Sequence, residues 1–343
     1  MLSSFTSDHV CILLVTSDLS VPAPTLVVMV GLPARGKTSM AIKLARYLNW
    51  LGLPTRIFNA GQYRRGAVKS YKSHELFAPT NEEGVNIRRH CARAALHDAR
   101  WYLREAGGKV AIFDATNTTR ERRAMILEFT QDWGCKVLFV ESLCDDQDVI
   151  AANIKEVKLN NRDYSTFSRD AAMTDFRKRI ECYEAAHEPL DDNFDRELSY
   201  IKVLDGGCHL SVNHLVSHIQ SKIAICLMSL RLWSRSVYLW QLESDSGHPG
   251  SDPTRNWQVM TCNTVLFKVG EKTLVLVFQN YGDVVRRLEP LVLELERQCG
   301  ALVLCSEMDL RILLAYFLDV GCGKTHINTH TNTHKDSPPP MIT

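Results

Sequence analysis

The stretch that most constrains the fold is VVMVGLPARGKTSM, residues 27–40, in which an apolar run breaks into a glycine-rich turn. The turn has the pattern Gly31-x-x-x-x-Gly36-Lys37-Thr38, and the residues that follow, KTSMAIKLARYLNWL, have helical periodicity. Glycines let the backbone curl so that several N–H groups point at one phosphate, beside a helix N-terminus that favours negative charge. The sequence therefore predicts a strand, a phosphate-binding loop and a helix in succession.

Two residues of this loop and one from a later strand predict the chemistry of the site. Lys37 would reach the β- and γ-phosphates of a nucleotide, and the Thr38 hydroxyl would ligate Mg²⁺. The stretch KVAIFDATNTTRERR, residues 109–123, contains a buried strand that ends at Asp114. Ligands of open α/β sheets bind at the carboxyl ends of the strands. Asp114 could hold Mg²⁺ or accept the proton of an acceptor hydroxyl; the alternative is that it caps the helix that follows.

Strand-like and helical patterns alternate along most of the chain. The strands are predicted at 25–30, 55–59, 109–114, 136–142 and 199–205, and helices at 37–51, 82–105, 120–133 and 169–187. This alternation is typical of an α/β fold in which helices cover both faces of a mostly parallel sheet. After about residue 234 the pattern changes, and strand–helix–strand–helix character returns only at 273–319.

The composition is that of a soluble protein, with 45% hydrophobic and 23% charged residues. The formal net charge of +1 argues against a general nucleic-acid binder. The 11 cysteines are odd in number and form no metal-type pairs, which favours reduced thiols. The apolar run VCILLV is too short to span a bilayer, and no secretory signal is visible. We therefore expect a cytoplasmic protein with neither a membrane nor a nucleic acid as its partner.

The arginine pattern indicates an acceptor that already carries a phosphate. Arg64, in QYRR, follows the second predicted strand and so leaves from the same sheet edge as the phosphate loop. An arginine fork binds a phosphate bidentately, which a neutral acceptor does not need. Arg179 and Tyr183 stand four residues apart and share one face of a predicted helix. The two side chains could bind a phosphate and a hydroxyl of one ligand, or they could be a surface arginine beside a packed tyrosine.

A longer set of motifs resembles a known family. The motifs occur between Pro24 and Trp233 in this order: TLVVMVGLPARGKT, RYLNWLG, FNAGQYRR, VAIFDATNTTRERR, ESLCDD, NIKEVKL, KRIECYE and LSYIK. They are similar to the kinase half of 6-phosphofructo-2-kinase/fructose-2,6-bisphosphatase. The resemblance implies transfer of the γ-phosphoryl group of ATP, with Mg²⁺, to the 2-hydroxyl of fructose 6-phosphate. The product, fructose 2,6-bisphosphate, is a regulator of glycolysis and gluconeogenesis, and the family suggests a homodimer formed through the kinase domain.

Carried over position by position, the resemblance assigns three groups of residues. The ATP site falls on Gly31, Leu32, Pro33, Ala34, Arg35, Gly36, Lys37, Thr38, Ser39, Asn153, Ile154, Lys155, Glu156, Val157 and Lys158. The sugar-phosphate contacts fall on Arg64, Arg88, Thr116, Arg122, Lys158, Arg179 and Tyr183. The catalytic positions are Lys37, Asp114, Cys144 and Lys158. Cys144 is expected to be structural or close to the substrate, because direct transfer forms no covalent enzyme intermediate.

In this family a histidine phosphatase follows the kinase, and in this chain it is expected to be damaged. Its first strand should end in Arg-His-Gly, but SVYLWQLESDSG, residues 236–247, has no such triplet. Ser306 stands where the family has a second catalytic histidine, and a serine does not replace an imidazole nucleophile without an activating base. We expect loss of the bisphosphatase activity. We also expect poor burial and easy proteolysis of the region after residue 234.

These expectations divide the chain into four parts: a tail at 1–23, a P-loop kinase domain at 24–233, a truncated phosphoglycerate-mutase-like remnant at 234–320 and a disordered tail at 321–343. Two other functions remain open. One is a kinase that acts on a polynucleotide 5′-hydroxyl, although binding a polyanion needs many phosphate contacts and the net charge is small. The other is a non-catalytic partner of full-length relatives, although no motif is broken as that function would predict.

Overall fold

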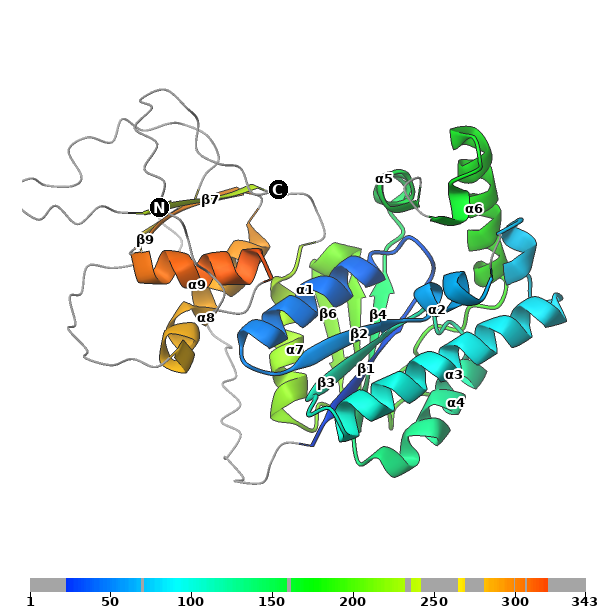
Figure 1. The fold of residues 1–343 in the computed structure, drawn as a ribbon, viewed down its shortest axis with the longest axis horizontal. Coiled ribbons are helices and arrows are strands. Elements are labelled where there is room, and N and C mark those ends of the chain that lie inside the picture. Colours follow the sequence, from blue (N-terminus) through cyan, green and yellow to red (C-terminus); the bar gives the residue numbers. More distant parts are fainter. Residues whose placement is uncertain are drawn as a thin grey trace, which may run out of the picture.

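The computed structural model describes residues 23–68, 71–158, 162–231, 236–241, 265–268, 281–298, 300–305 and 307–319. Within them, the main sheet has the strand order β2-β3-β1-β4-β5-β6, parallel throughout except between β5 and β6 (Figure 1). The strands are β1 (Thr25–Val30), β2 (Thr55–Asn59), β3 (Val110–Asp114), β4 (Lys136–Leu143), β5 (Tyr200–Leu204) and β6 (His209–Asn213). The mostly parallel sheet is confirmed, and the predicted strands agree with β1 to β5 to within one residue at each end.

Helices lie on both faces of this sheet. They are α1 (Lys37–Trp50), α2 (Ala60–Ala67), α3 (Glu82–Arg104), α4 (Arg120–Thr130), α5 (Gln147–Lys158), α6 (Arg169–Glu184) and α7 (His218–Ser229). Val27 and Met29 of β1 pack with buried side chains of α1 and α7, whereas Leu26 and Val28 pack with those of α3 and α4. The alternation follows from the strand repeat of two residues. Because both faces are covered, β1 is an unbroken buried apolar run.

The parallel register places the functional ends of three strands at one edge. Asn59, the last residue of β2, is paired with Asp114, the last residue of β3. Val28 of β1 is paired with Phe113, so the loop that follows β1 leaves from the same edge. The helix α2 was not predicted, because it has only eight residues and two of them are glycines, which disfavour a helix. It begins here because the Asn59 side chain caps it, accepting a hydrogen bond from the backbone N–H of Gln62.

The C-terminal part forms a second, three-stranded parallel sheet in the order β7-β9-β8. Its elements are β7 (Ser236–Gln241), β8 (Val265–Lys268), α8 (Tyr281–Arg297), β9 (Gly300–Cys305) and α9 (Glu307–Phe317). The expectation that this region buries apolar surface poorly is wrong for α8 and α9. Val292, Leu295 and Leu313 are fully buried and belong to the same core cluster as α1 and α7. The apolar surface that the short sheet cannot supply comes from α1 and α7.

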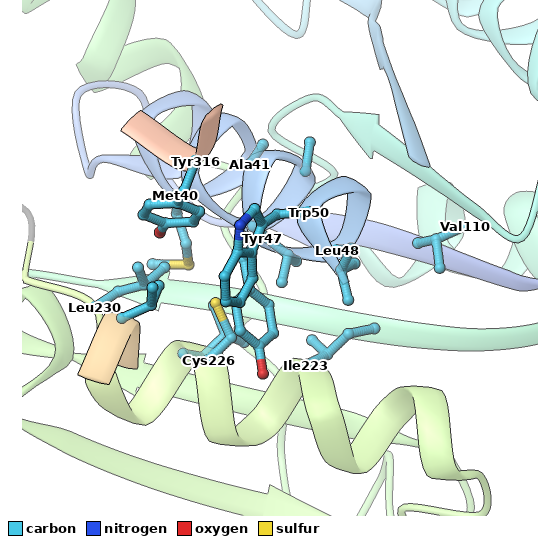
Figure 2. Packing of buried hydrophobic residues seen from close by; sticks show 14 of the residues in the cluster. Met40, Ala41, Tyr47, Leu48, Trp50, Val110, Ile223, Cys226, Leu230 and Tyr316 are labelled. Carbon is cyan, nitrogen blue, oxygen red and sulfur yellow. The ribbon is translucent and has the colours of Figure 1, made fainter. Parts of the chain in front are cut away.

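Aromatic side chains fill the contact between α1 and α9. Figure 2 shows Tyr47 and Trp50 of α1, Cys226 of α7 and Tyr316 of α9 in one buried cluster. The rings of Trp50 and Tyr316 meet edge to face, with centroids 5.6 Å apart. The indole N–H of Trp50 donates to the carbonyl of Ile312 at 3.3 Å. The helix that starts at the phosphate loop therefore packs directly on the C-terminal helices.

Two buried carboxylates of α8 fix the polar part of this contact. Glu296, 1% exposed, accepts hydrogen bonds from Arg46 at 2.8 Å and from the Tyr316 hydroxyl at 2.7 Å, and Lys43 lies 3.4 Å away. The second carboxylate, Glu289, accepts from the hydroxyl of Tyr47 and from Lys222 of α7, each at 2.6 Å. Buried charges are tolerated where they are paired in this way.

Replacing Glu296 by Ala should lower the free energy of unfolding by about 3–5 kcal/mol, because it leaves the α1 cations facing a buried surface without their carboxylate. Urea unfolding followed by intrinsic tryptophan fluorescence, to which the buried Trp50 contributes, measures the effect. The control is Glu294→Ala on the same helix, which contacts Arg297 and Gln298 and should cost less than about 1 kcal/mol. Equal effects of the two substitutions would contradict a contact that stabilises α1.

Within the described part of the chain, no helix is both long and apolar enough to cross a membrane.

Candidate active site

The phosphate loop has the backbone shape that its glycines allow. Gly31 has φ +129°, and a Cβ at this position would lie 2.6 Å from the carbonyl oxygen of Ser142. A side chain is therefore excluded both by conformation and by the close approach of β4. Gly36 has φ 80° and precedes α1, which has no side-chain cap. The first N–H groups of α1 are thus left to bind an anion such as a phosphate.

Contacts from other elements hold the loop in place. The side chain of Lys37 is 7% exposed and donates to the Leu32 carbonyl at 2.5 Å, so it lies along the loop itself. Arg35 is buried, forms an ion pair with Glu184 at 3.6 Å, and its carbonyl accepts a short hydrogen bond from the Ser142 hydroxyl. Contacts with α6 and β4 therefore fix the backbone of the loop.

The predicted ATP-site residues of α5 fall into three groups. Asn153 donates from its side chain to the carbonyl of Ala34 at 3.0 Å and thereby joins α5 to the loop. Ile154 is 3% exposed and belongs to an apolar cluster against which Ala34 of the loop packs, and Lys155 is exposed. The side chains of Glu156, Val157 and Lys158 lie outside the described residues. Asn153 therefore joins α5 to the loop by a hydrogen bond, and Ile154 belongs to the apolar cluster on which the loop packs.

Asp114 lies at the centre of the strand ends. It is 3% exposed and accepts hydrogen bonds from the Thr38 hydroxyl at 2.8 Å and from the side-chain amide of Asn59 at 2.5 Å. The alternative that Asp114 caps the next helix is wrong, because the N-cap of α4 is Thr119. Asn59 was not among the predicted site residues, although its position after a strand and before QYRR is that of an N-cap.

One cavity of about 1200 Å³ contains both halves of the predicted site. The loop residues Gly36, Lys37, Thr38 and Ser39 line it together with Asp114. All the predicted sugar-phosphate residues with described side chains line it too: Arg64, Arg88, Thr116, Arg122, Arg179 and Tyr183. The sequence left open whether Arg179 and Tyr183 are surface residues, but both face this cavity. Cys144 is 8% exposed and does not line the cavity, which favours its structural role.

The arginines of the cavity are arranged around an aromatic ring. The guanidinium carbon of Arg179 lies 3.8 Å from the ring centroid of Phe77, and those of Arg64 and Arg88 lie 5.3 and 5.7 Å away. Burial alone would raise the pKa of Tyr183, but the positive charges of Arg179 and Arg88 outweigh it, and the pKa is below its usual value. This wall of the cavity is therefore strongly cationic and suits an anionic ligand.

Two contacts of this wall were missed by the sequence analysis. Asp163 pairs with both Arg64 and Arg179, and Phe77 packs against the arginines from η1 (His74–Phe77), a short 3-10 helix. Neither follows a strand or belongs to a recognisable motif. Only the three-dimensional structure brings them together.

Comparison with known proteins identifies the family. The family model of 6-phosphofructo-2-kinase matches residues 15–234. The protein 6-phosphofructo-2-kinase/fructose-2,6-bisphosphatase 4 of Rattus norvegicus is 44% identical over 366 residues, covering 86% of this chain and 78% of that protein. Its Homo sapiens counterpart has the same identity and coverage. The form numbered 1 of Bos taurus is 41% identical over 367 residues, covering 87% of this chain and 78% of that protein.

These alignments are longer than the 343 residues of the chain, so internal stretches of the relatives have no counterpart here. The range matched by the family model, residues 15–234, includes the phosphate loop, Asp114 and the arginine wall. The chain therefore belongs to the 6-phosphofructo-2-kinase/fructose-2,6-bisphosphatase family.

Proposed function

We propose that the protein transfers the γ-phosphoryl group of ATP to the 2-hydroxyl of fructose 6-phosphate. The observation that carries this proposal is the single cavity in which a phosphate loop and Asp114 face a wall of arginines. A nucleotide on the loop and a sugar phosphate on the arginines would share this cavity. Phosphoryl transfer is mainly a matter of positioning and of stabilising charge, and the cavity offers groups for both.

The loop end of the cavity would bind the nucleotide. The N–H groups at the start of α1 would hold its phosphates, and Asn153 would keep α5 against the loop. Lys37 would leave the Leu32 carbonyl and turn its ammonium group to the β- and γ-phosphates. Its charge would then lie where negative charge develops during transfer. Lys158 is proposed for the same role by family resemblance.

Thr38 and Asp114 fit a magnesium ion. The hydroxyl and the carboxylate lie 2.8 Å apart, and such hard oxygen donors are the ligands that Mg²⁺ takes beside nucleotide phosphates. When bound, the ion would neutralise phosphate charge. Asn59 fixes the orientation of Asp114 through its 2.5 Å hydrogen bond. Asp114 would also lie in position to accept the proton of the 2-hydroxyl.

The arginine wall would anchor the sugar phosphate. Arg64, Arg88 and Arg179 offer several N–H donors in fork geometry for the 6-phosphate, and Arg122, Thr116 and Tyr183 complete the wall. A polynucleotide kinase would need a cationic track beyond one phosphate, and the net charge of +1 gives no support for it. A non-catalytic role would leave this complete set of charges unexplained.

We further propose four parts of the chain with the bounds given above, a cytoplasmic location and a homodimer formed through the kinase region. The strand β6 supports the dimer, because it is an edge strand of the main sheet within the described residues. We propose that the remnant after residue 234 stabilises α1 by packing against it and does not catalyse hydrolysis.

Loss of the bisphosphatase activity predicts that labelled fructose 2,6-bisphosphate leaves no phosphoenzyme after an acid quench. The strand β7 ends at Gln241 with no Arg-His-Gly after it, and Ser306, which lies outside the described residues, is not an imidazole. Both catalytic histidines of the family, the nucleophile included, are therefore missing at their expected positions. A stable labelled protein would contradict this proposal.

The kinase proposal is tested by incubating the protein with labelled MgATP and either fructose 6-phosphate or an oligonucleotide with a 5′-hydroxyl. We expect label only in the sugar bisphosphate. Label in the oligonucleotide alone would favour the polynucleotide kinase, and no transfer to either acceptor would favour the non-catalytic partner.

A further inference from the structure

A buried carboxylate lies behind the arginine wall. Asp163 accepts a short hydrogen bond from Arg64, and Arg179 lies 3.7 Å from the same carboxylate oxygen. Arg64 is 3% and Asp163 5% exposed. Both arginines line the cavity, but Asp163 does not. The carboxylate therefore contacts the two guanidinium groups from outside the cavity lining.

The two guanidinium groups need such a partner. They come from different helices, α2 and α6, and both lie against the ring of Phe77. Two guanidinium groups beside one carboxylate oxygen and one aromatic ring are neighbours, and their positive charges repel each other. A shared carboxylate offsets this repulsion. The pKa of the neighbouring Arg65 depends on the same charges. Burial lowers this pKa, the negative charge of Asp163 raises it, and the positive charges of Arg64 and Arg179 lower it further.

The position of Asp163 is itself fixed. It lies in η3 (Arg162–Tyr164), a single 3-10 turn, and the next residue, Tyr164, is 3% exposed. The Tyr164 hydroxyl donates to Asp175 of α6 at 3.0 Å, and its ring meets that of Phe167 edge to face. The turn is therefore anchored to the helix that also carries Arg179.

We propose that Asp163 is a positioning residue of the sugar-phosphate site, which holds Arg64 and Arg179 in their binding geometry before the substrate arrives. The inference rests on the proposed assignment of these two arginines to the 6-phosphate. When the side chains of a site are already held in place, less free energy is spent on ordering them as the ligand binds, and the ligand binds more tightly. Asp163 acts through the arginines and does not touch the substrate.

The test is Asp163→Asn in the full chain. The KM for fructose 6-phosphate should rise at least about tenfold, whereas the KM for ATP and kcat should change less than about threefold, because the loop and Asp114 are untouched. Asp195→Asn is the matched control. Asp195 is 8% exposed and lies 3.8 Å from the buried Arg123, and neither residue lines the cavity. This control measures the effect of losing a buried aspartate–arginine pair elsewhere in the fold.

Thermal melting of each variant shows whether it is folded. If Asp163→Asn does not fold, Asp163→Glu replaces it, because it keeps the charge but moves the carboxylate, and it should raise the same KM by a smaller factor. A lower KM for fructose 6-phosphate would mean that Asp163 competes with the substrate for the arginines, and would overturn the inference. Equal rises in both KM values, or the same change in Asp195→Asn, would also overturn it, because a general structural role would then suffice.

Arg179→Ala in the same assay separates this inference from the proposed function. If Arg179→Ala leaves the KM for fructose 6-phosphate unchanged, the assignment of the phosphate site fails. If Arg179→Ala raises that KM and Asp163→Asn does not, only the inference about Asp163 fails.

Discussion

Replacing Lys37 by Met should reduce phosphoryl transfer by about a thousandfold or more and leave the fold intact. The ammonium group of Lys37 would stabilise the negative charge that develops on the phosphoryl group during transfer. Electrostatic stabilisation of this kind is among the largest contributions to catalysis. Methionine keeps most of the length of the side chain, so the apolar contacts of this 7%-exposed residue should survive. Initial rates at saturating MgATP and fructose 6-phosphate measure the effect.

Lys136→Met is the control for this loss. Lys136 is exposed and begins β4, so it lies at the amino edge of the sheet, opposite the phosphate loop. Its replacement should leave the rate unchanged. A Lys37→Met protein that melts like the unmodified protein and still turns over at its rate would refute the assignment of the loop.

Replacing Arg179 by Ala should raise the KM for fructose 6-phosphate by a factor equivalent to about 2–4 kcal/mol, with little change in the KM for ATP. The guanidinium group lines the cavity and packs against Phe77, and it has no described contact with the phosphate loop. A charge-assisted contact with the 6-phosphate is lost in this variant, whereas the nucleotide contacts remain. Steady-state kinetics with each substrate varied in turn separate the two KM values.

Arg177→Ala provides the matched control, because Arg177 is exposed and lies on the same helix, two residues earlier. It should leave both KM values unchanged. Equal increases in the two KM values of Arg179→Ala would indicate general destabilisation of α6 instead of a lost substrate contact.

Much of the fold could be predicted because its signals are local. The buried strands are short apolar runs, and the phosphate loop is a fixed spacing of glycine, lysine and threonine. The position of Asp114 followed from the rule that parallel strands end at one edge, and its contact with Thr38 agrees with that rule. The arginine wall could be assembled from the family resemblance because each of its members stands at a matching position.

The remaining features depend on contacts between distant parts of the chain. Asp163 and Arg64 form a hydrogen bond although they are 99 residues apart in the sequence, and Glu296 and Arg46 do so at a separation of 250 residues. No local pattern marks either carboxylate as paired, since an acidic residue in a turn or on a helix is usually solvated. The error about the C-terminal helices has the same origin. Their own sheet is short, but α1 supplies the surface that they bury.

The most direct test of the kinase assignment is the position of the phosphate on the product. The protein is incubated with MgATP labelled in the γ-phosphate and with fructose 6-phosphate, and the purified product is treated with mild acid. A phosphate on the 2-hydroxyl is attached to the anomeric carbon, so we predict that acid releases the label and restores fructose 6-phosphate. The account would be contradicted if the label stayed on the sugar after acid treatment, because the phosphate would then be an ester of another hydroxyl. A product without label would contradict it as well.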